Sequence, residues 1–321
     1  MVKKHWLSIS SKCNNFCLFC LDAENQINGC FKSDEEVIKG MKSGLKLKAT
    51  RLILSGGEAT IHPHFIKFIK KAKELGYQEI QVITNGRMFA YEKFLNQAVC
   101  AGLTEATFSI HSHFEKKYEK MSGIGGSYKQ AIKGLNNALK QPGLIINIDI
   151  VINKLNYKDI YNTIIFFANK YKICEYDLLQ IIPMGRAWAN YEILFYDLEK
   201  VWPYLKKVFE LAKNDRRFHI WTNRFPAQYL EGYEFLIQDP FKIKDDVLGA
   251  REMFENYLNN GNLMGCYNLK RCQLCNLRHF CEELMNFKNS TNKSVKKHIE
   301  NHVHSPRCYY YKKMNINFDF I

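Results

Sequence analysis

Short apolar runs alternate with amphipathic helical patterns from residue 6 to about residue 182, and this alternation restricts the fold more than any other feature. Each run is too short for a buried helix, and the clearest one, residues 145–152, is rich in β-branched side chains. The six predicted strands are residues 6–9, 51–55, 79–84, 106–110, 145–152 and 176–182. Strands that alternate with helices predict a parallel α/β sheet or barrel, and residues 217–222 form a last predicted strand.

Residues able to do chemistry follow directly after the predicted strands. In parallel β/α folds, ligands bind at the carboxyl ends of the strands, so we expect these side chains to converge on one site. His111 and His113 would point to opposite faces of an extended segment, and one of them could exchange a proton with a substrate. The residues in these positions are Cys13, Cys17, Cys20, Glu58, Asn85, His111, His113 and Arg186.

Three cysteines at spacings of four and three, Cys13, Cys17 and Cys20, form the most specific motif. Thiolates are soft ligands, and an iron-sulfur cluster held by only three of them keeps one iron open to a non-protein ligand. A zinc loop completed by a distant fourth ligand is the alternative, because closely spaced cysteines also suit tetrahedral zinc. The other strand-end residues favour the cluster, since a zinc loop alone does not require them.

This CxxxCxxC arrangement after a first strand resembles the defining motif of the radical S-adenosylmethionine superfamily. The resemblance implies an α/β fold, a partial (β/α)6 TIM-like barrel, in which the three cysteines hold a 4Fe-4S cluster whose open iron binds S-adenosylmethionine. It also implies reductive cleavage of that cofactor to a 5'-deoxyadenosyl radical, which abstracts a hydrogen from the substrate. An electron donor such as flavodoxin or ferredoxin would supply the electron.

Further stretches resemble motifs of the branch that contains the molybdenum-cofactor enzyme and peptide maturases. Residues 55–60 resemble the GGE motif that binds the methionine amine, with Ala59 in place of the usual proline. Residues 84–86 match a TNG stretch, and residues 181–187 resemble the sixth-strand ending, where apolar side chains lie against the adenine. The resemblance implies cofactor contacts at Phe19, Gly56, Gly57, Glu58, Asn85, Ser109, Ile182 and Arg186.

A second group of four cysteines follows the region of alternating strands and helices. Its successive members are six, three and six residues apart. Four thiolates this close can close a zinc site or fill a cubane cluster. The pattern resembles part of the SPASM or twitch extension, with Met285 where a further cysteine is expected, and implies one auxiliary 4Fe-4S cluster. Cys308 competes with Cys266 as the fourth ligand. The predicted ligands are Cys266, Cys272, Cys275 and Cys281.

We therefore predict two domains, a radical barrel over residues 1–225 and an auxiliary-cluster region over residues 226–321. The chain shows no export signal and no apolar window long enough to span a bilayer. Its 11 cysteines then favour metal ligation in a reducing compartment, which predicts a cytoplasmic protein with no membrane partner. Cys30, Cys100 and Cys174 lack metal spacing and are expected to be small buried residues.

The net charge of +14 could attract an anionic partner, but its lysines are spread along the chain, so a nucleic-acid partner is not the favoured interpretation. The leading hypothesis is a radical enzyme that modifies a peptide or protein. The same chemistry on a small metabolite or nucleotide is the enzymatic alternative. A zinc-stabilised RNA-binding protein is the alternative from another class.

Overall fold

The structure is a computed structural model that describes residues 3–22, 28–237, 246–247 and 250–289 of the 321-residue chain. The chain separates into two compact units, Met1–Gln238 and Asp239–Ile321. Unit 1 extends past the predicted boundary at residue 225, because Ile237 forms an isolated β-bridge with Thr222. The functions assigned to the two predicted domains stay predictions.

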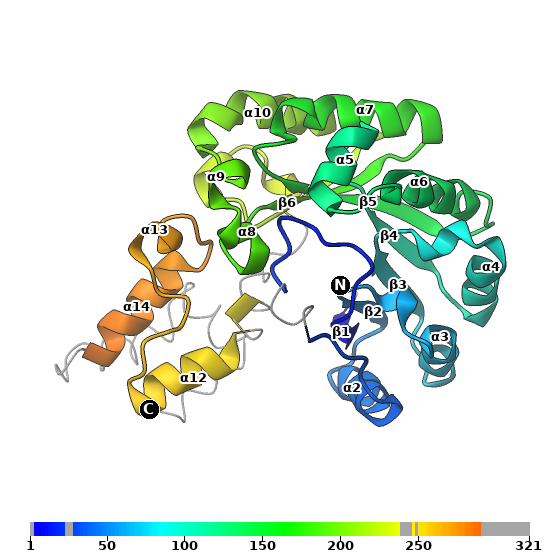
Figure 1. The fold of residues 1–321 in the computed structure, drawn as a ribbon, viewed down its shortest axis with the longest axis horizontal. Coiled ribbons are helices and arrows are strands. Elements are labelled where there is room, and N and C mark those ends of the chain that lie inside the picture. The colour runs from blue at the N-terminus through cyan, green and yellow to red at the C-terminus, as the bar shows by residue number, and fades with distance from the viewer. Residues whose placement is uncertain (1–2, 23–27, 238–245, 248–249, 290–321) are drawn as a thin grey trace. The chain divides into compact units, whose positions relative to one another are not determined.

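Seven parallel strands form one sheet in unit 1, and their order in the sheet equals their order in the chain. The sheet is curved but not closed (Figure 1), and β1 and β7 stand at the two ends of the strand order. The predicted partial barrel is confirmed, and the last predicted strand joins the same sheet as β7. The strands are β1 (Lys4–Ser10), β2 (Arg51–Gly56), β3 (Glu79–Thr84), β4 (Glu105–Ser109), β5 (Ile145–Ile152), β6 (Glu175–Gln180) and β7 (His219–Asn223).

The longer helices of unit 1 lie along the outer side of the curved sheet (Figure 1). They are α2 (Asp34–Lys46), α3 (Phe65–Glu74), α4 (Glu92–Ala101), α6 (Ser127–Ala138), α7 (Ile160–Tyr171) and α10 (Leu198–Asn214). Local signals explain where they start, since Ser33 and Glu36 form a reciprocal capping box at the beginning of α2. Their apolar faces pack on the sheet, and Phe65 and Phe68 of α3 belong to the same buried cluster as Leu54 of β2.

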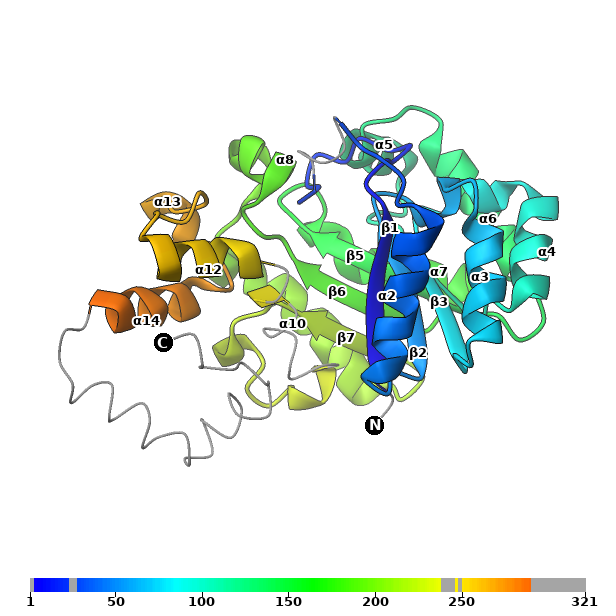
Figure 2. The ribbon, with the colours of Figure 1, turned by 90° about the horizontal axis from the view of Figure 1, so that it is seen from below.

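Shorter helices lie at the ends of the strands. They are α5 (Glu115–Ser122), α8 (Gly185–Ala189), α9 (Tyr191–Leu194) and the 3-10 turns Ala59–Ile61, Met88–Ala90, Tyr157–Asp159, Ala227–Tyr229 and Glu234–Leu236. Figure 2 shows α5 and α8 near the loop that follows β1. These two helices supply much of the support for the cysteine loop.

The strands turn different side chains to their two faces. In β5, Ile148 and Ile150 are fully buried in the core against the helices, whereas Asn147 and Asp149 face the inside of the curve. This alternation follows from the two-residue period of a strand. It places several polar side chains, among apolar ones, on the inner face of the sheet.

Unit 2 is described for residues 246–247 and 250–289. It contains α12 (Arg251–Asn260), α13 (Leu269–Cys272) and α14 (Arg278–Asn289). Its buried apolar cluster consists of Phe254, Tyr257 and Met264. None of the helices in the described part of the chain is long and apolar enough to cross a membrane.

Candidate active site

The cysteine loop between β1 and α2 is held by the end of α5. The Phe16 amide donates to the Ser122 carbonyl at 2.8 Å, and the Leu18 amide donates to the Met121 carbonyl at 2.9 Å. A Cβ atom at Gly123 would approach the Phe16 carbonyl to 2.5 Å, so glycine permits this close passage. The loop is therefore anchored by backbone contacts along the segment that carries the motif.

Arg186, at the start of α8, holds the loop from a second side. Its Nε donates to the Cys17 carbonyl at 2.9 Å, and its backbone amide donates to the Cys20 carbonyl at 2.9 Å. Its guanidinium lies 3.8 Å from the centre of the Phe16 ring, a cation–π contact. Asn190 adds a bond from its Nδ2 to the Leu18 carbonyl at 3.2 Å. In this structure Arg186 positions the cysteine loop, and its predicted cofactor contact stays a prediction.

The end of β3 supports the loop from a third side. The Asn85 Nδ2 donates to the Asn14 Oδ1 at 2.6 Å, which joins the TNG stretch to the residue after Cys13. Arg87 donates to the Asn15 Oδ1 at 2.8 Å and to the Asn14 carbonyl. Asn85 and Arg87 thus connect two segments that are about 70 residues apart in the sequence.

Gly56 and Gly57 let the turn after β2 approach the start of the cysteine loop. The Gly57 amide donates to the Ser10 carbonyl at 2.6 Å, and the Glu58 amide donates to the Lys12 carbonyl at 2.8 Å. Gly56 has a φ of +130°, and added Cβ atoms at the two glycines would collide with the Ser10 and Lys12 carbonyls. The space that the glycines leave is filled by backbone of the loop.

Glu58 is buried, and four protein groups donate to its carboxylate. The Asn85 amide and the Thr84 hydroxyl donate at 2.7 Å each, and the Thr60 amide and hydroxyl also donate. Three of these bonds reach Oε1 and one reaches Oε2, which leaves Oε2 with capacity for a further donor. Burial raises the pKa of Glu58, and the bonds from Thr60, Asn85 and Thr84 oppose that rise.

The three thiols of the loop lie near one another. Burial and the neighbouring Cys13 and Cys20 all raise the pKa of the Cys17 thiol. The Asn15 amide donates to the Cys13 sulfur at 3.3 Å. Across the ranges that the structure describes, no three His, Cys, Asp or Glu side chains are arranged as a ready metal-ligand set. Which residues bind metal therefore stays a prediction.

The remaining predicted residues are Ser109 at the end of β4, Phe19 in the cysteine loop and Ile182 after β6. Ser109 donates from its hydroxyl to the Asp149 Oδ2 at 3.1 Å. The Phe19 ring meets the His111 ring edge to face, with 4.6 Å between ring centres. Ile182 is half-buried just after β6. Cofactor contacts at these residues stay predictions.

His111 does not fit the role of a proton carrier near neutral pH. Burial lowers the pKa of His111 to about 3. Its Nδ1 accepts a hydrogen bond from the Val151 amide at 3.1 Å, so the ring is held neutral. His113 lies elsewhere, with its Nδ1 2.9 Å from the Thr163 hydroxyl.

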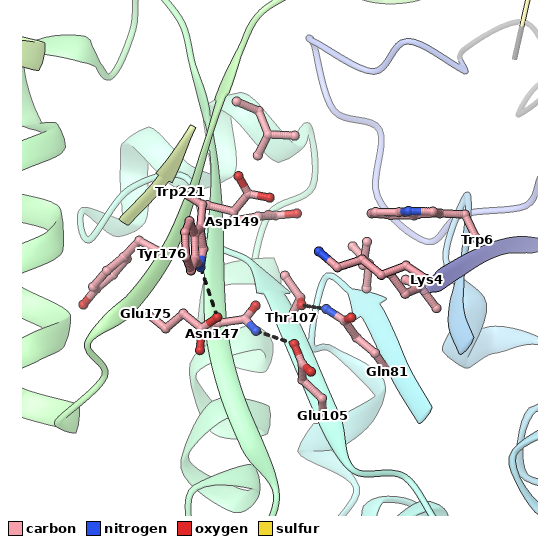
Figure 3. A pocket seen from close by; sticks show the side chains of 14 residues that line it. Lys4, Trp6, Gln81, Glu105, Thr107, Asn147, Asp149, Glu175, Tyr176 and Trp221 are labelled. Carbon is pink, nitrogen blue, oxygen red and sulfur yellow. Dashed lines mark hydrogen bonds between the residues drawn. The ribbon is translucent and has the colours of Figure 1, made fainter. Parts of the chain in front are cut away.

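A polar cavity inside the curved sheet was not anticipated from the sequence. It receives side chains from all seven strands, including Lys4 and Trp6 of β1, Asp149 of β5 and Trp221 of β7 (Figure 3). The signal was present as polar residues at alternate positions of apolar strands, such as Asn147 and Asp149 within residues 145–152. These polar residues lie on different strands, and the pairing of the strands is what brings them to one cavity.

The second cysteine group lies in unit 2, between α12 and the first turns of α14. The pKa of Cys281 is raised to about 12 by burial and by Cys275, Cys266 and Cys272 nearby. Asn268 caps α13, which carries Cys272, by accepting from the Arg271 amide at 3.2 Å. Met285, where the resembled module would have a cysteine, packs on the apolar cluster of unit 2. The competing candidate Cys308 lies outside the described residues.

The three cysteines without metal spacing are not all buried. Cys30 and Cys100 are exposed and Cys174 is half-buried, so the expectation of small buried residues is wrong. Cys100 belongs to α4, whose buried residues are Leu95 and Ala98. Its position lies outside the face that packs on the sheet.

A family comparison defines the class of protein. Residues 7–167 match the model of the radical SAM superfamily, and the chain belongs to this superfamily. It is therefore a radical SAM enzyme, and membership implies a 4Fe-4S cluster, S-adenosylmethionine and a source of electrons. The matched range contains the cysteine loop and the ends of β2 to β5.

Named relatives share about two thirds of the chain. A probable GTP 3',8-cyclase of Saccharolobus solfataricus is 23% identical over 216 residues, which are 66% of this chain and 67% of the relative. A probable GTP 3',8-cyclase of Sulfurisphaera tokodaii is 23% identical over 229 residues, 71% of this chain and 72% of the relative.

Solved structures share the fold. SuiB of Streptococcus suis, bound to the precursor peptide SuiA, aligns with a TM-score of 0.55 and 16% identity over 74% of this chain. The hydrogenase maturase HydG of Carboxydothermus hydrogenoformans aligns with a TM-score of 0.56 and 15% identity, also over 74% of this chain. The aligned part spans only 52% of the SuiB chain and 57% of the HydG chain. At these identities the likeness concerns the fold alone.

The residues of the cysteine loop fit the cluster that the family implies. Three thiols lie in one short loop at the carboxyl edge of a parallel sheet, and sulfur is the donor that iron-sulfur clusters require. The loop is already bonded by Arg186, Asn85 and the end of α5. These contacts fix the backbone of the loop, whereas the thiol side chains would still have to adjust to hold a cluster.

Proposed function

We propose that Cys13, Cys17 and Cys20 hold the cluster of this radical SAM enzyme and that the ends of the neighbouring strands hold S-adenosylmethionine. When bound, cluster and cofactor supply a one-electron cleavage that leads to hydrogen abstraction from a substrate. The observation that carries the proposal is the anchoring of the cysteine loop by residues from β3, α5 and α8. A flavodoxin or ferredoxin is the proposed electron donor.

Glu58 is the residue we assign to the cofactor's ammonium group. Its Oε2 accepts from the Asn85 amide and retains capacity for one more donor. A charge-assisted bond to an ammonium would use that capacity. Burial favours this pairing, because a buried carboxylate without a cation is costly. The other assigned cofactor residues are Phe19, Gly56, Gly57, Asn85, Ser109, Ile182 and Arg186.

For the substrate, we propose a peptide or protein. The inner cavity supports this choice over a nucleoside triphosphate, because its lining contains four acidic side chains, Glu105, Asp149, Glu175 and Asp177, and one basic side chain, Lys4. Phosphate groups would meet like charges there. A nucleotide remains the alternative, and the names of the relatives at 23% identity favour it.

For unit 2, we propose one auxiliary 4Fe-4S cluster on Cys266, Cys272, Cys275 and Cys281. Besides burial, the three other thiols raise the pKa of Cys281, which supports a grouping of all four. A structural zinc ion on the same thiols is the alternative. Metal analysis separates the two, because one predicts additional iron and the other predicts zinc.

The proposed function is tested by anaerobic reconstitution, chemical reduction and mass spectrometry of the products. Wild-type protein should form 5'-deoxyadenosine from S-adenosylmethionine, and the variant with all three loop cysteines changed to Ala should form none. Cys100→Ala is the matched control, since it removes an exposed thiol outside both groups. Adding GTP tests the alternative, and a GTP-derived product that appears only with the wild type would replace the peptide proposal.

A further inference from the structure

The cavity inside the sheet extends from the first residues of three strands, Lys4, Glu105 and Glu175, to Asp149 in the middle of β5. The register pairs Ser109, the last residue of β4, with Asp149, and pairs Asp149 with Asp177 of β6. Both aspartates line the cavity, and Asp149 lies therefore at the height where β4 ends. The carboxyl ends of parallel strands are where ligands of such folds bind. The two aspartates are thus level with the carboxyl end of β4.

The lining of the cavity contains more acidic than basic side chains. Glu105 is paired with Arg51 at 2.9 Å and accepts from the Asn147 amide group at 2.8 Å. Without Glu105, the lining still has three carboxylates, those of Asp149, Glu175 and Asp177, against the single ammonium of Lys4. Trp221 donates only a long bond of 3.4 Å to Glu175. Among the described residues that line the cavity, acidic side chains therefore outnumber basic ones.

Asp149 has an acceptor atom without a donor. Its Oδ2 accepts from Ser109, but its Oδ1 is buried and receives no hydrogen bond from any residue in the described part of the chain. Asp177 lies beside it in the register and accepts from the Asn223 Nδ2. Buried acceptors are normally paired, and adjacent carboxylates repel each other. A cationic donor between Asp149 and Asp177 would donate to the Asp149 Oδ1 and would also reduce the repulsion between the two carboxylates.

Two tryptophans line the same cavity. Trp6 lies across from Asp149 and Trp221, as Figure 3 shows, and it keeps 42% of its surface exposed although it stands in the middle of β1. Indole faces attract ammonium and guanidinium groups. The cavity volume of about 60 Å³ holds a few waters or a small charged group, and it is too small for a nucleobase with its phosphates.

We infer that Asp149 and Asp177 form a subsite for a cationic nitrogen group of the substrate, an ammonium or a guanidinium, flanked by Trp6 and Trp221. The inference rests on the proposed function, because it names the substrate chemistry of that same site. A lysine or arginine side chain of a peptide and a small free amine both carry this group. The subsite distinguishes cationic substrates from neutral and anionic ones.

Calorimetric titration of the full-length, cluster-loaded protein tests the inference. The probes are n-butylammonium, the tripeptide Ala-Lys-Ala, neutral n-butanol and anionic butyrate, at pH 8, where Asp149 is largely ionised. We expect the two cations to bind and the other two probes to give no binding heat. Tighter binding of the tripeptide than of butylammonium would identify a peptide as the source, and the reverse order would identify a small amine.

Asp149→Asn and Asp177→Asn should each weaken binding of both cations at least tenfold, since each keeps the side-chain shape and removes a charge. Glu74→Gln is the matched control, because it removes one negative charge on the exposed side of α3. Circular dichroism verifies that the variants fold. Equal binding of butanol and butylammonium, or unchanged affinity in both variants, would overturn the inference.

These measurements do not require turnover. Binding of the cations without 5'-deoxyadenosine formation would leave the subsite standing and contradict the proposed function. Formation of 5'-deoxyadenosine without cation binding would do the opposite. The two proposals can therefore fail separately.

Discussion

The two cysteine groups of this chain stand in different kinds of structure. The loop with Cys13, Cys17 and Cys20 is bonded to α5, α8 and the end of β3, all parts of a seven-stranded unit with a large buried core. The group in unit 2 lies among short helices around a cluster of three buried residues. Small units with few buried side chains usually depend on metal or disulfide links for stability. We infer that contacts with the seven-stranded unit hold the cysteine loop in place. The folding of unit 2 should instead depend on the metal that its cysteines bind.

The largest expected effect separates the two groups by their metal content. Reconstituted wild-type protein should hold roughly eight irons, as two four-iron clusters. Changing the loop cysteines to Ala should remove about half of the iron, and changing the four cysteines of unit 2 should remove the other half. Iron analysis and elemental analysis for zinc measure this. Zinc in place of the second four irons would show that unit 2 holds a structural zinc site.

The next prediction concerns what each unit loses with its metal. Cys272→Ala/Cys275→Ala should make residues 250–289 cleavable by protease at least about tenfold faster, because metal binding supplies folding free energy to small sites. The loop variant Cys17→Ala should leave the seven-stranded sheet as resistant as in the wild type. Limited proteolysis with mass spectrometry locates the cuts. Equal protection of unit 2 in both variants would mean that its apolar cluster is sufficient for folding.

A smaller effect is expected at Glu58. Glu58→Gln keeps the shape of the side chain and removes its charge, so the affinity for S-adenosylmethionine should fall about ten- to a hundredfold, as expected for a charge-assisted bond of about 1.5–3 kcal/mol. Thr84→Val is the control, because it removes one donor to Glu58 and keeps the carboxylate. It should weaken binding less. Titration of the cluster-loaded variants measures both, and unchanged affinity in Glu58→Gln would make Glu58 a structural residue only.

The smallest predicted effect is on the pH dependence of stability. Burial raises the pKa of Asp149 to about 7 from the ordinary 3.8, with an opposing bond from Ser109 and a further rise from Asp177. The folded state therefore binds the proton of the Asp149 carboxyl group more tightly than the unfolded state does. As a result, the contribution of Asp149 to the free energy of unfolding declines as pH rises from about 4 to about 7. Asp149→Asn removes this decline. Its melting temperature should exceed that of the wild type by more at pH 8 than at pH 5, and an equal difference at both values would contradict the assignment.

Much of the fold was predictable because its signals are local. The β-branched run 145–152 and the capping residue Ser33 each specify one element, and the alternation of such elements specifies a parallel sheet. The cysteine loop and Glu58 could be placed at one edge of the sheet for the same reason. The addition of β7 to that sheet needed the strand register.

The contacts within the site were less predictable because they join distant segments. The bond from Arg186 to the Cys17 carbonyl spans 169 residues of sequence, and nothing near either residue indicates it. The pairing of Asp149 with Asp177 likewise depends on the register of β5 against β6. His111 looked available for proton transfer from its position, but its burial in the folded chain holds it neutral.

The most direct test of the central claim is electron paramagnetic resonance of the reduced protein with and without S-adenosylmethionine. We expect the cofactor to change the cluster spectrum of the wild type and of the variant without the four cysteines of unit 2. We expect no such change in the variant without Cys13, Cys17 and Cys20. A cofactor-dependent spectrum in that last variant would contradict the assignment of the cysteine loop.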